Sequence, residues 1–412
     1  MSLFNIIAIL LTLSALFSYL NHRFFHLPTT VGLMLAALLM SLALLLLAAL
    51  DIHFEDDARL LLERINFSDT LLHGMLAFLL FAGALHIDLE DLSRHKWIIG
   101  ILATVGILFS SLLIGFSSHW IFALLGMDIP LIYCFLFGAL ISPTDPIAVL
   151  GILKSAGAPR ALEIKIAGES LFNDGVAVVL FLALIGLLTG GEELTVSGLF
   201  HLFMQEAVGG LLFGLFLGWL AFQLLKSIDD YPVEIIITLA LVTGGYSLAE
   251  YLHLSAPIAI VVAGLLVGNH GRTFAMSDKT IEHLDSFWEL VDEMLNGVLF
   301  VLIGLEVLVL TVNGDVLLAG LLIIPMILLV RMLSVGIPIT LFQMRRTFPK
   351  GTVPILTWGG LRGGISVALA LSLPTGNERE ILLAVTYIVV VFSILVQGLT
   401  IEGLVRRLSL RE

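Results

Sequence analysis

Residues 135–146 read Phe-Leu-Phe-Gly-Ala-Leu-Ile-Ser-Pro-Thr-Asp-Pro, an apolar segment that ends in two prolines around a threonine and an aspartate. A second segment, residues 168–175, reads Gly-Glu-Ser-Leu-Phe-Asn-Asp-Gly and continues into the apolar residues 176–188. An acidic side chain at the centre of a bilayer costs about 3 kcal/mol, so such residues are found mainly where they line an ion or proton path. The two segments therefore predict a membrane transporter of ions or protons.

The composition places the whole chain in a membrane. Of the 412 residues, 59% are hydrophobic and 13% are charged, whereas soluble domains have about 25% charged residues. The net charge of −13 argues against nucleic acid as a partner, and no nucleotide-binding P-loop motif occurs. We expect an all-α polytopic membrane protein surrounded by lipid, a single transmembrane unit over residues 1–412.

A transmembrane helix needs about 20 mostly apolar residues. By this measure the chain has about thirteen spans, near residues 3–20, 28–50, 66–87, 97–118, 129–153, 161–188, 198–225, 233–252, 255–270, 287–310, 316–343, 352–374 and 380–402. If the N-terminus lies outside, fifteen of the 20 Lys and Arg residues fall on one side of the membrane and three on the other. Because basic loops stay inside, we expect a cytoplasmic C-terminus and, for a prokaryotic protein, the inner (plasma) membrane.

Thirteen spans allow two inverted six-span repeats with one span between them, a plan common in secondary transporters. Spans 5 and 12 hold corresponding places, and both are interrupted. Pro143 and Pro146 flank Thr144-Asp145 in span 5, and residues 359–364 of span 12 read Gly-Gly-Leu-Arg-Gly-Gly. The sequence therefore predicts broken, crossed helices at these two places, although the glycines alone fit close helix packing equally well.

The polar residues near these breaks form an all-oxygen set. Ser170 and Asp174 are four residues apart and share one helix face, and Glu169 and Asn173 share a neighbouring one. Together with Thr144 and Asp145 they offer carboxylates, hydroxyls and an amide, which suit Na⁺, K⁺ or Li⁺ better than a transition metal. Because burial and a nearby acid both favour the protonated carboxyl, Asp174 is expected to hold either a proton or a metal cation. Competition for one group is the simplest physical basis for exchange.

Two buried arginines need partners. Arg331 lies within span 11, and Glu169 is the most suitable carboxylate to pair with it. The alternative is that Arg331 extends to the cytoplasmic surface, which is disfavoured because it lies about a dozen residues before Arg345. Such a pair would be structural and would leave Asp174 free for transport. We expect Arg362, in the interrupted span 12, to balance the charge of the broken helix ends.

These residues resemble the signature motifs of NhaP-type sodium/proton antiporters, the branch shared with the eukaryotic sodium/hydrogen exchangers. The motifs are residues 142–146, residues 168–175 and residues 359–363, in that order, and the resemblance extends over nearly the whole chain. It implies cation binding by Asp174, Asp145, Ser170 and Thr144, with Asn173 beside them, and a Glu169–Arg331 ion pair.

The resemblance also implies a homodimer without a cofactor, which transports Na⁺ (or Li⁺ or K⁺) and H⁺. A core domain, about 97–188 and 316–402, would move like an elevator against a dimerisation domain, about 3–87 and 198–310. The Asn173-Asp174 pair implies electroneutral one-for-one exchange, since an amide cannot release a second proton. Ala82 stands where some prokaryotic members have an acid, so a cation contact from that position is not expected here.

Two other functions remain open. A monovalent cation channel would use the same oxygen ligands, and it would carry a large voltage-driven current instead of obligate exchange. An intramembrane hydrolase is disfavoured, because Phe172 replaces the second glycine of the Gly-x-Ser-x-Gly motif. We therefore expect a transporter and not an enzyme.

Overall fold

The computed structural model describes residues 3–48, 50, 70–145, 149–151, 153, 160–189, 196–308, 310, 313–343 and 351–409. All regular secondary structure in these ranges is helical, which confirms the all-α prediction. Eight of the described helices are long and apolar enough to cross a membrane, and two shorter apolar helices cover Thr70–Leu85 and Leu131–Ile141. The count of thirteen spans and the inverted repeats stay predictions.

Most of the helices overlap the predicted spans, and several extend beyond them. Their bounds are α1 Leu3–Leu20, α2 Thr29–Ala48, α5 Leu76–Leu85, α6 Leu89–Ile101, α7 Ile107–Leu124, α8 Leu131–Ile141, α10 Arg160–Leu188, α11 Val196–Lys226, α12 Tyr231–Tyr251, α13 Ala256–Leu266, α14 Arg272–Phe274, α15 Asp278–Glu306, α16 Gly314–Gln343, α17 Thr352–Trp358, α18 Gly364–Leu371, α19 Asn377–Phe392 and α20 Gly398–Ser409. Single π-helical turns join α6 to α7 and α19 to α20, so each of these pairs forms one continuous rod.

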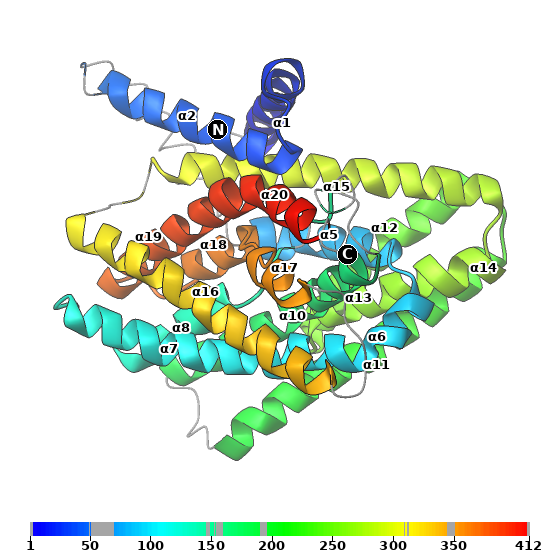
Figure 1. Ribbon diagram of the computed structural model, residues 1–412. Coiled ribbons are helices and arrows are strands. Elements are labelled where there is room, and N and C mark those ends of the chain that lie inside the picture. The colour runs from blue at the N-terminus through cyan, green and yellow to red at the C-terminus, as the bar shows by residue number, and fades with distance from the viewer. Residues whose placement is uncertain are drawn as a thin grey trace.

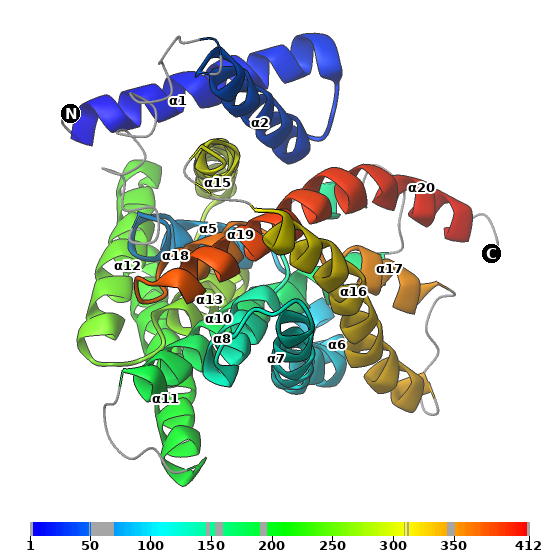
Figure 2. The same ribbon diagram turned by 90° about the vertical axis from the view of Figure 1, so that its left-hand side faces the viewer.

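The first group of helices consists of α1, α2, α5, α11, α12, α13 and α15, which pack mainly on one another. Helix α15 lies beneath α1 and α2 in Figure 1 and is seen end-on between them and the remaining helices in Figure 2. Close approach to α2 depends on Gly304, where a Cβ atom would lie 2.3 Å from that of Ala37. The Ser41 hydroxyl donates a hydrogen bond to the Gly304 carbonyl at 2.9 Å.

The second group consists of α6, α7, α8, α10 and α16 to α20. Helix α16 crosses α7 and α19 in both views (Figures 1 and 2). Small residues again allow close contact, because a Cβ atom at Gly138 of α8 would lie 2.2 Å from the Ser111 carbonyl oxygen of α7. This group contains both interrupted helices.

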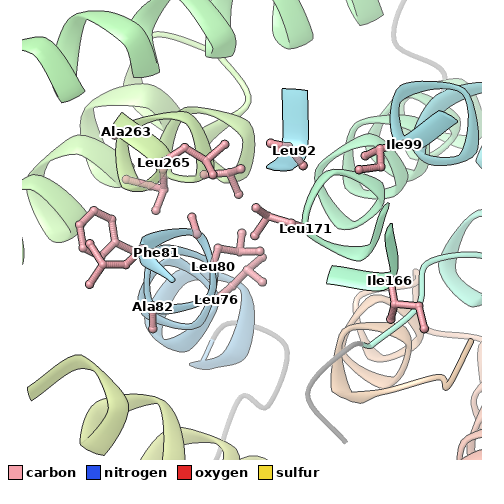
Figure 3. Close-up of a cluster of buried hydrophobic side chains, with 14 of the residues drawn as sticks. Leu76, Leu80, Phe81, Ala82, Leu92, Ile99, Ile166, Leu171, Ala263 and Leu265 are labelled. Carbon is pink, nitrogen blue, oxygen red and sulfur yellow. The ribbon is translucent and has the colours of Figure 1, made fainter. Parts of the chain in front are cut away.

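An apolar contact joins the two groups. Figure 3 shows side chains of α5 and α13, from the first group, beside side chains of α6 and α10, from the second. Leu171 of α10 extends towards Leu80 of α5, and all the side chains labelled in the figure are buried. Ala82 is among them, with 2% of its surface exposed. Hydrophobic packing is therefore part of the contact between the two groups.

Candidate functional site

The two broken helices cross at the middle of the second group. Helix α8 ends at Ile141, and residues 142–145 are not helical; α17 ends at Trp358, and α18 begins at Gly364. The Asp145 backbone N–H donates to the Leu361 carbonyl at 2.8 Å, which ties the two breaks together. A Cβ atom at Gly363 would lie 2.2 Å from Asp145 Oδ2, so the crossing requires glycine at this position. Pro146 lies outside the described residues.

Arg362 lies at the crossing, with 3% of its surface exposed. Its guanidinium donates to the Ser142 carbonyl and, at 2.8 Å, to the Pro143 carbonyl. Those carbonyls belong to the C-terminal end of α8, which carries the partial negative charge of the helix dipole. Arg362 thus lies at the C-terminal end of α8, one of the broken helix ends. That it balances the charge of this helix end during transport stays a prediction.

The predicted ion ligands gather around Thr144. The Ser170 hydroxyl donates to the Thr144 carbonyl, and the Asn173 amide donates to Thr144 Oγ1 at 2.9 Å. Asp174, on the same helix, is 7% exposed and close enough to Asp145 for their charges to repel. Thr144, Asp145 and Asp174 line one cavity.

Ser170 and Asn173 do not line that cavity, and both are fully buried. Their hydrogen bonds reach Thr144 from α10 and hold the non-helical segment in place. In this conformation they support the site from behind, whereas the three cavity residues face the open space. Among the described residues, no three His, Cys, Asp or Glu side chains converge as a metal-binding group.

Glu169 and Arg331 form an ion pair next to the crossing. The guanidinium donates to both carboxylate oxygens, Nη1 to Oε1 and Nη2 to Oε2 at 3.0 Å. The side chains are 1% and 7% exposed. This two-pronged geometry is the strongest form of such a contact, and it joins α10 to α16. Arg331 Nε has no hydrogen-bond partner among the described residues and borders a small cavity of about 10 Å³.

The large cavity has a volume of about 860 Å³ and leads to Asp145 and Asp174 past a strongly acidic wall. Its other carboxylates are Asp88, Asp91, Glu163, Asp285, Glu289 and Asp292, and the basic groups are Arg160 and His86. Arg160 pairs with Asp91 at 2.9 Å.

Of this acidic wall, the sequence indicates Asp292 alone, which with Glu293 near the inner end of span 10 predicts a solvated helix end or funnel. The signal that was available is the spacing of Asp285, Glu289 and Asp292, which recur at intervals of four and three residues on α15. Such intervals put all three on one helix face. A stripe of acids on a predicted transmembrane helix would have pointed to a water-filled passage.

Carboxylates at the crossing of two broken helices, reached through an acidic cavity, define a secondary ion transporter. The comparisons with known proteins agree. The family described as sodium/hydrogen exchanger, transmembrane, matches residues 10–407, and the chain belongs to that family. It is an integral membrane transporter and not an enzyme.

The relatives cover nearly the whole chain. The Na⁺/H⁺ antiporter NhaP of Pseudomonas aeruginosa is 52% identical over 409 residues, which are 98% of this chain and 96% of that protein. The Na⁺/H⁺ antiporter NhaH of Halobacillus dabanensis is 38% identical over 394 residues, 93% of this chain and 92% of that protein. The sodium proton antiporter MjNhaP1 of Methanocaldococcus jannaschii has the same fold, with a TM-score of 0.74 and 20% identity over 98% of this chain and 97% of its own.

Proposed function

We propose that this protein exchanges Na⁺ for H⁺ across the membrane by competition of the two ions for Asp174. The observation that supports this most strongly is the placement of Asp174, Asp145 and Thr144 together on the wall of one acidic cavity. The relatives named as Na⁺/H⁺ antiporters point to the same activity. Li⁺ and K⁺ are the other candidate cations for an oxygen site of this kind.

The ligands that we assign to the cation are Asp174, Asp145 and Thr144 in the first place. Ser170 and Asn173 belong to the same proposed site, and a small rotation of either side chain would turn an oxygen towards the ion. A bound Na⁺ would lie between two carboxylates that otherwise repel each other. A proton on Asp174 relieves the same repulsion, so either ion neutralises the pair.

One-for-one electroneutral exchange follows if only one of the paired groups carries the proton. Asn173 is uncharged, and its amide is engaged with Thr144 Oγ1 at 2.9 Å. Glu169 is bound to Arg331 through both oxygens, which leaves Asp174 and Asp145 as the acids in the cavity next to the crossing. We propose that Glu169–Arg331 is structural and that Arg362 neutralises the end of α8.

Alternating access would come from movement of one helix group against the other. We propose that the second group is the core domain, about 97–188 and 316–402, and that the first group is the dimerisation domain, about 3–87 and 198–310. The apolar contact between them (Figure 3) has few directional bonds to break during sliding. The proposal includes a homodimer in the plasma membrane, with the N-terminus outside and the C-terminus in the cytoplasm.

Proteoliposomes with a pH-sensitive dye inside test this function. An imposed Na⁺ gradient should move protons with the membrane potential clamped at zero, and an imposed potential alone should have no effect. Asp174→Asn should abolish exchange, whereas Glu293→Gln, which removes the same charge from an exposed position, should not. Exchange retained in Asp174→Asn would refute the mechanism, and a large voltage-driven current would favour the channel alternative.

A further inference from the structure

Three acidic residues of the cavity, Asp285, Glu289 and Asp292, lie on α15 of the first helix group, and the charge of Asp292 interacts with Asp145 of the proposed ion site. Asp292 of α15 lines the cavity together with Asp145 and Asp174. It is half-buried, and its neighbour Glu293 is exposed and absent from the cavity wall. Asp292 therefore lies opposite the proposed site, on a helix that we assign to the other domain.

The charge of Asp292 has little to balance it. Its carboxylate is close enough to Asp145 for the two to repel, and Glu289 and Glu293 on the same helix add to the repulsion. Within the described part of the chain, no basic side chain forms an ion pair with Asp292. A cation between Asp292 and Asp145 would relieve the repulsion between the two carboxylates.

An amide side chain lies one helical turn further along α15. Asn296 is four residues after Asp292, on the same face of α15, and its side chain lies beside that carboxylate. Only 4% of Asn296 is exposed. Its amide N–H group hydrogen-bonds the Asp292 carboxylate, whereas its Oδ1 atom has no hydrogen-bond partner among the described residues. A buried carbonyl oxygen without a partner is costly, and it is the kind of ligand that a hard cation accepts.

From these observations we infer that Asp292 and Asn296 form a second binding station for a monovalent cation, on the α15 side of the cavity. The ion would arrive partly hydrated, exchange water for the Asp292 carboxylate and the Asn296 oxygen, and pass from there to Asp145 and Asp174. No covalent step is involved. The inference rests on the proposed function, since it describes how the same cation reaches the same site.

Matched variants test the station through the kinetics of exchange. Asp292→Asn should raise the apparent KM for cytoplasmic Na⁺ about tenfold and leave the maximal rate unchanged, because the ion is captured less well but released normally from Asp174. Glu293→Gln removes the same charge one residue away and should leave KM unchanged. Asp292→Glu keeps the carboxylate and should remain close to the parent protein, which separates lost binding from misfolding.

A general electrostatic effect makes a different prediction. If Asp292 only attracts cations over a distance, Glu289→Gln, at another position on the same cavity wall, should raise KM equally, and both effects should vanish at high ionic strength. That result would overturn the inference. An unchanged KM in Asp292→Asn would overturn it as well.

A structure of the protein soaked in Tl⁺, a monovalent ion with strong anomalous scattering, locates the ions directly. We expect one density at Asp174 and Asp145 and a second at Asp292 and Asn296, with only the second lost in Asp292→Asn. Density at Asp174 alone would refute the station and leave the proposed function intact. Absence of density at Asp174, together with absence of exchange, would refute the proposed function itself.

Discussion

Removal of the Arg331 side chain should destabilise the protein by about 3–5 kcal/mol, because it leaves the Glu169 carboxylate charged and buried without its partner. The structure supports the upper part of this range. Both side chains are less than one tenth exposed, and the guanidinium occupies both carboxylate oxygens. We expect Arg331→Ala and Glu169→Gln each to lower the melting temperature of the detergent-solubilised protein strongly.

The double variant Glu169→Gln/Arg331→Gln removes both charges and should recover part of the loss. The coupling free energy between the two positions should therefore exceed about 1 kcal/mol. Arg406→Ala is the control, because the Arg406–Glu402 pair is 63% and 44% exposed and such pairs contribute little. If the two single losses simply add in the double variant, direct pairing is not what stabilises this region and the reasoning is wrong.

Three further substitutions test the crossing and the contact between the helix groups. Gly363→Ala should abolish exchange, because its Cβ would lie 2.2 Å from Asp145 Oδ2. The enclosed pH-sensitive dye measures the exchange, and gel filtration shows whether the variant still folds. Gly360→Ala would place a Cβ 2.8 Å from the Nε of the buried ion pair, and we expect a lower melting temperature. Tyr387→Phe removes the hydroxyl that donates to the Ile303 carbonyl at 2.6 Å; the loss should be about 1–3 kcal/mol in thermal stability, with the KM for Na⁺ unchanged.

Much of the site could be predicted from the sequence, because acidic side chains within apolar membrane spans are costly in free energy. Asp145 and Asp174 interrupt apolar spans, and the prolines and glycines around them predicted the breaks that the structure has at residues 142–145 and 359–363. Helix periodicity predicted that Ser170 and Asp174 share one face of α10; in the structure Asp174 lines the cavity and Ser170 does not. Periodicity within one helix does not predict which segment packs against that helix. It therefore did not predict the hydrogen bond from the Ser170 hydroxyl to the Thr144 carbonyl.

The ends of the helices were harder to predict, because polar residues extend them beyond the apolar spans. Helix α6 begins at Leu89, eight residues before the predicted span, where the Asp88 side chain accepts hydrogen bonds from the N–H groups of Glu90 and Asp91. Helix α15 begins at Asp278, nine residues before its predicted span, with Ser277 as its N-cap. Asp91 and Asp285 of the acidic cavity lie on these extensions. Hydropathy alone therefore excluded part of the cavity wall from the predicted spans, whereas Glu163, Glu289 and Asp292 lie inside them.

The choice of cation is beyond what the sequence pattern can predict. Na⁺, Li⁺ and K⁺ differ by small amounts in radius, and the same oxygen ligands bind each of them at slightly different distances. A series of exchange rates with the three ions, measured at several pH values on the purified protein, decides between them. For the proposed competition, each transported cation should show a KM that rises as the pH falls.

Calorimetry of Na⁺ binding to the purified protein tests the competition for Asp174 most directly. Titrations in buffers with different ionisation enthalpies count the protons released for each Na⁺ bound. At a pH where the site is protonated, the account predicts close to one proton released per ion, and neither binding nor release in Asp174→Asn. Binding of Na⁺ without proton release at every pH would contradict it.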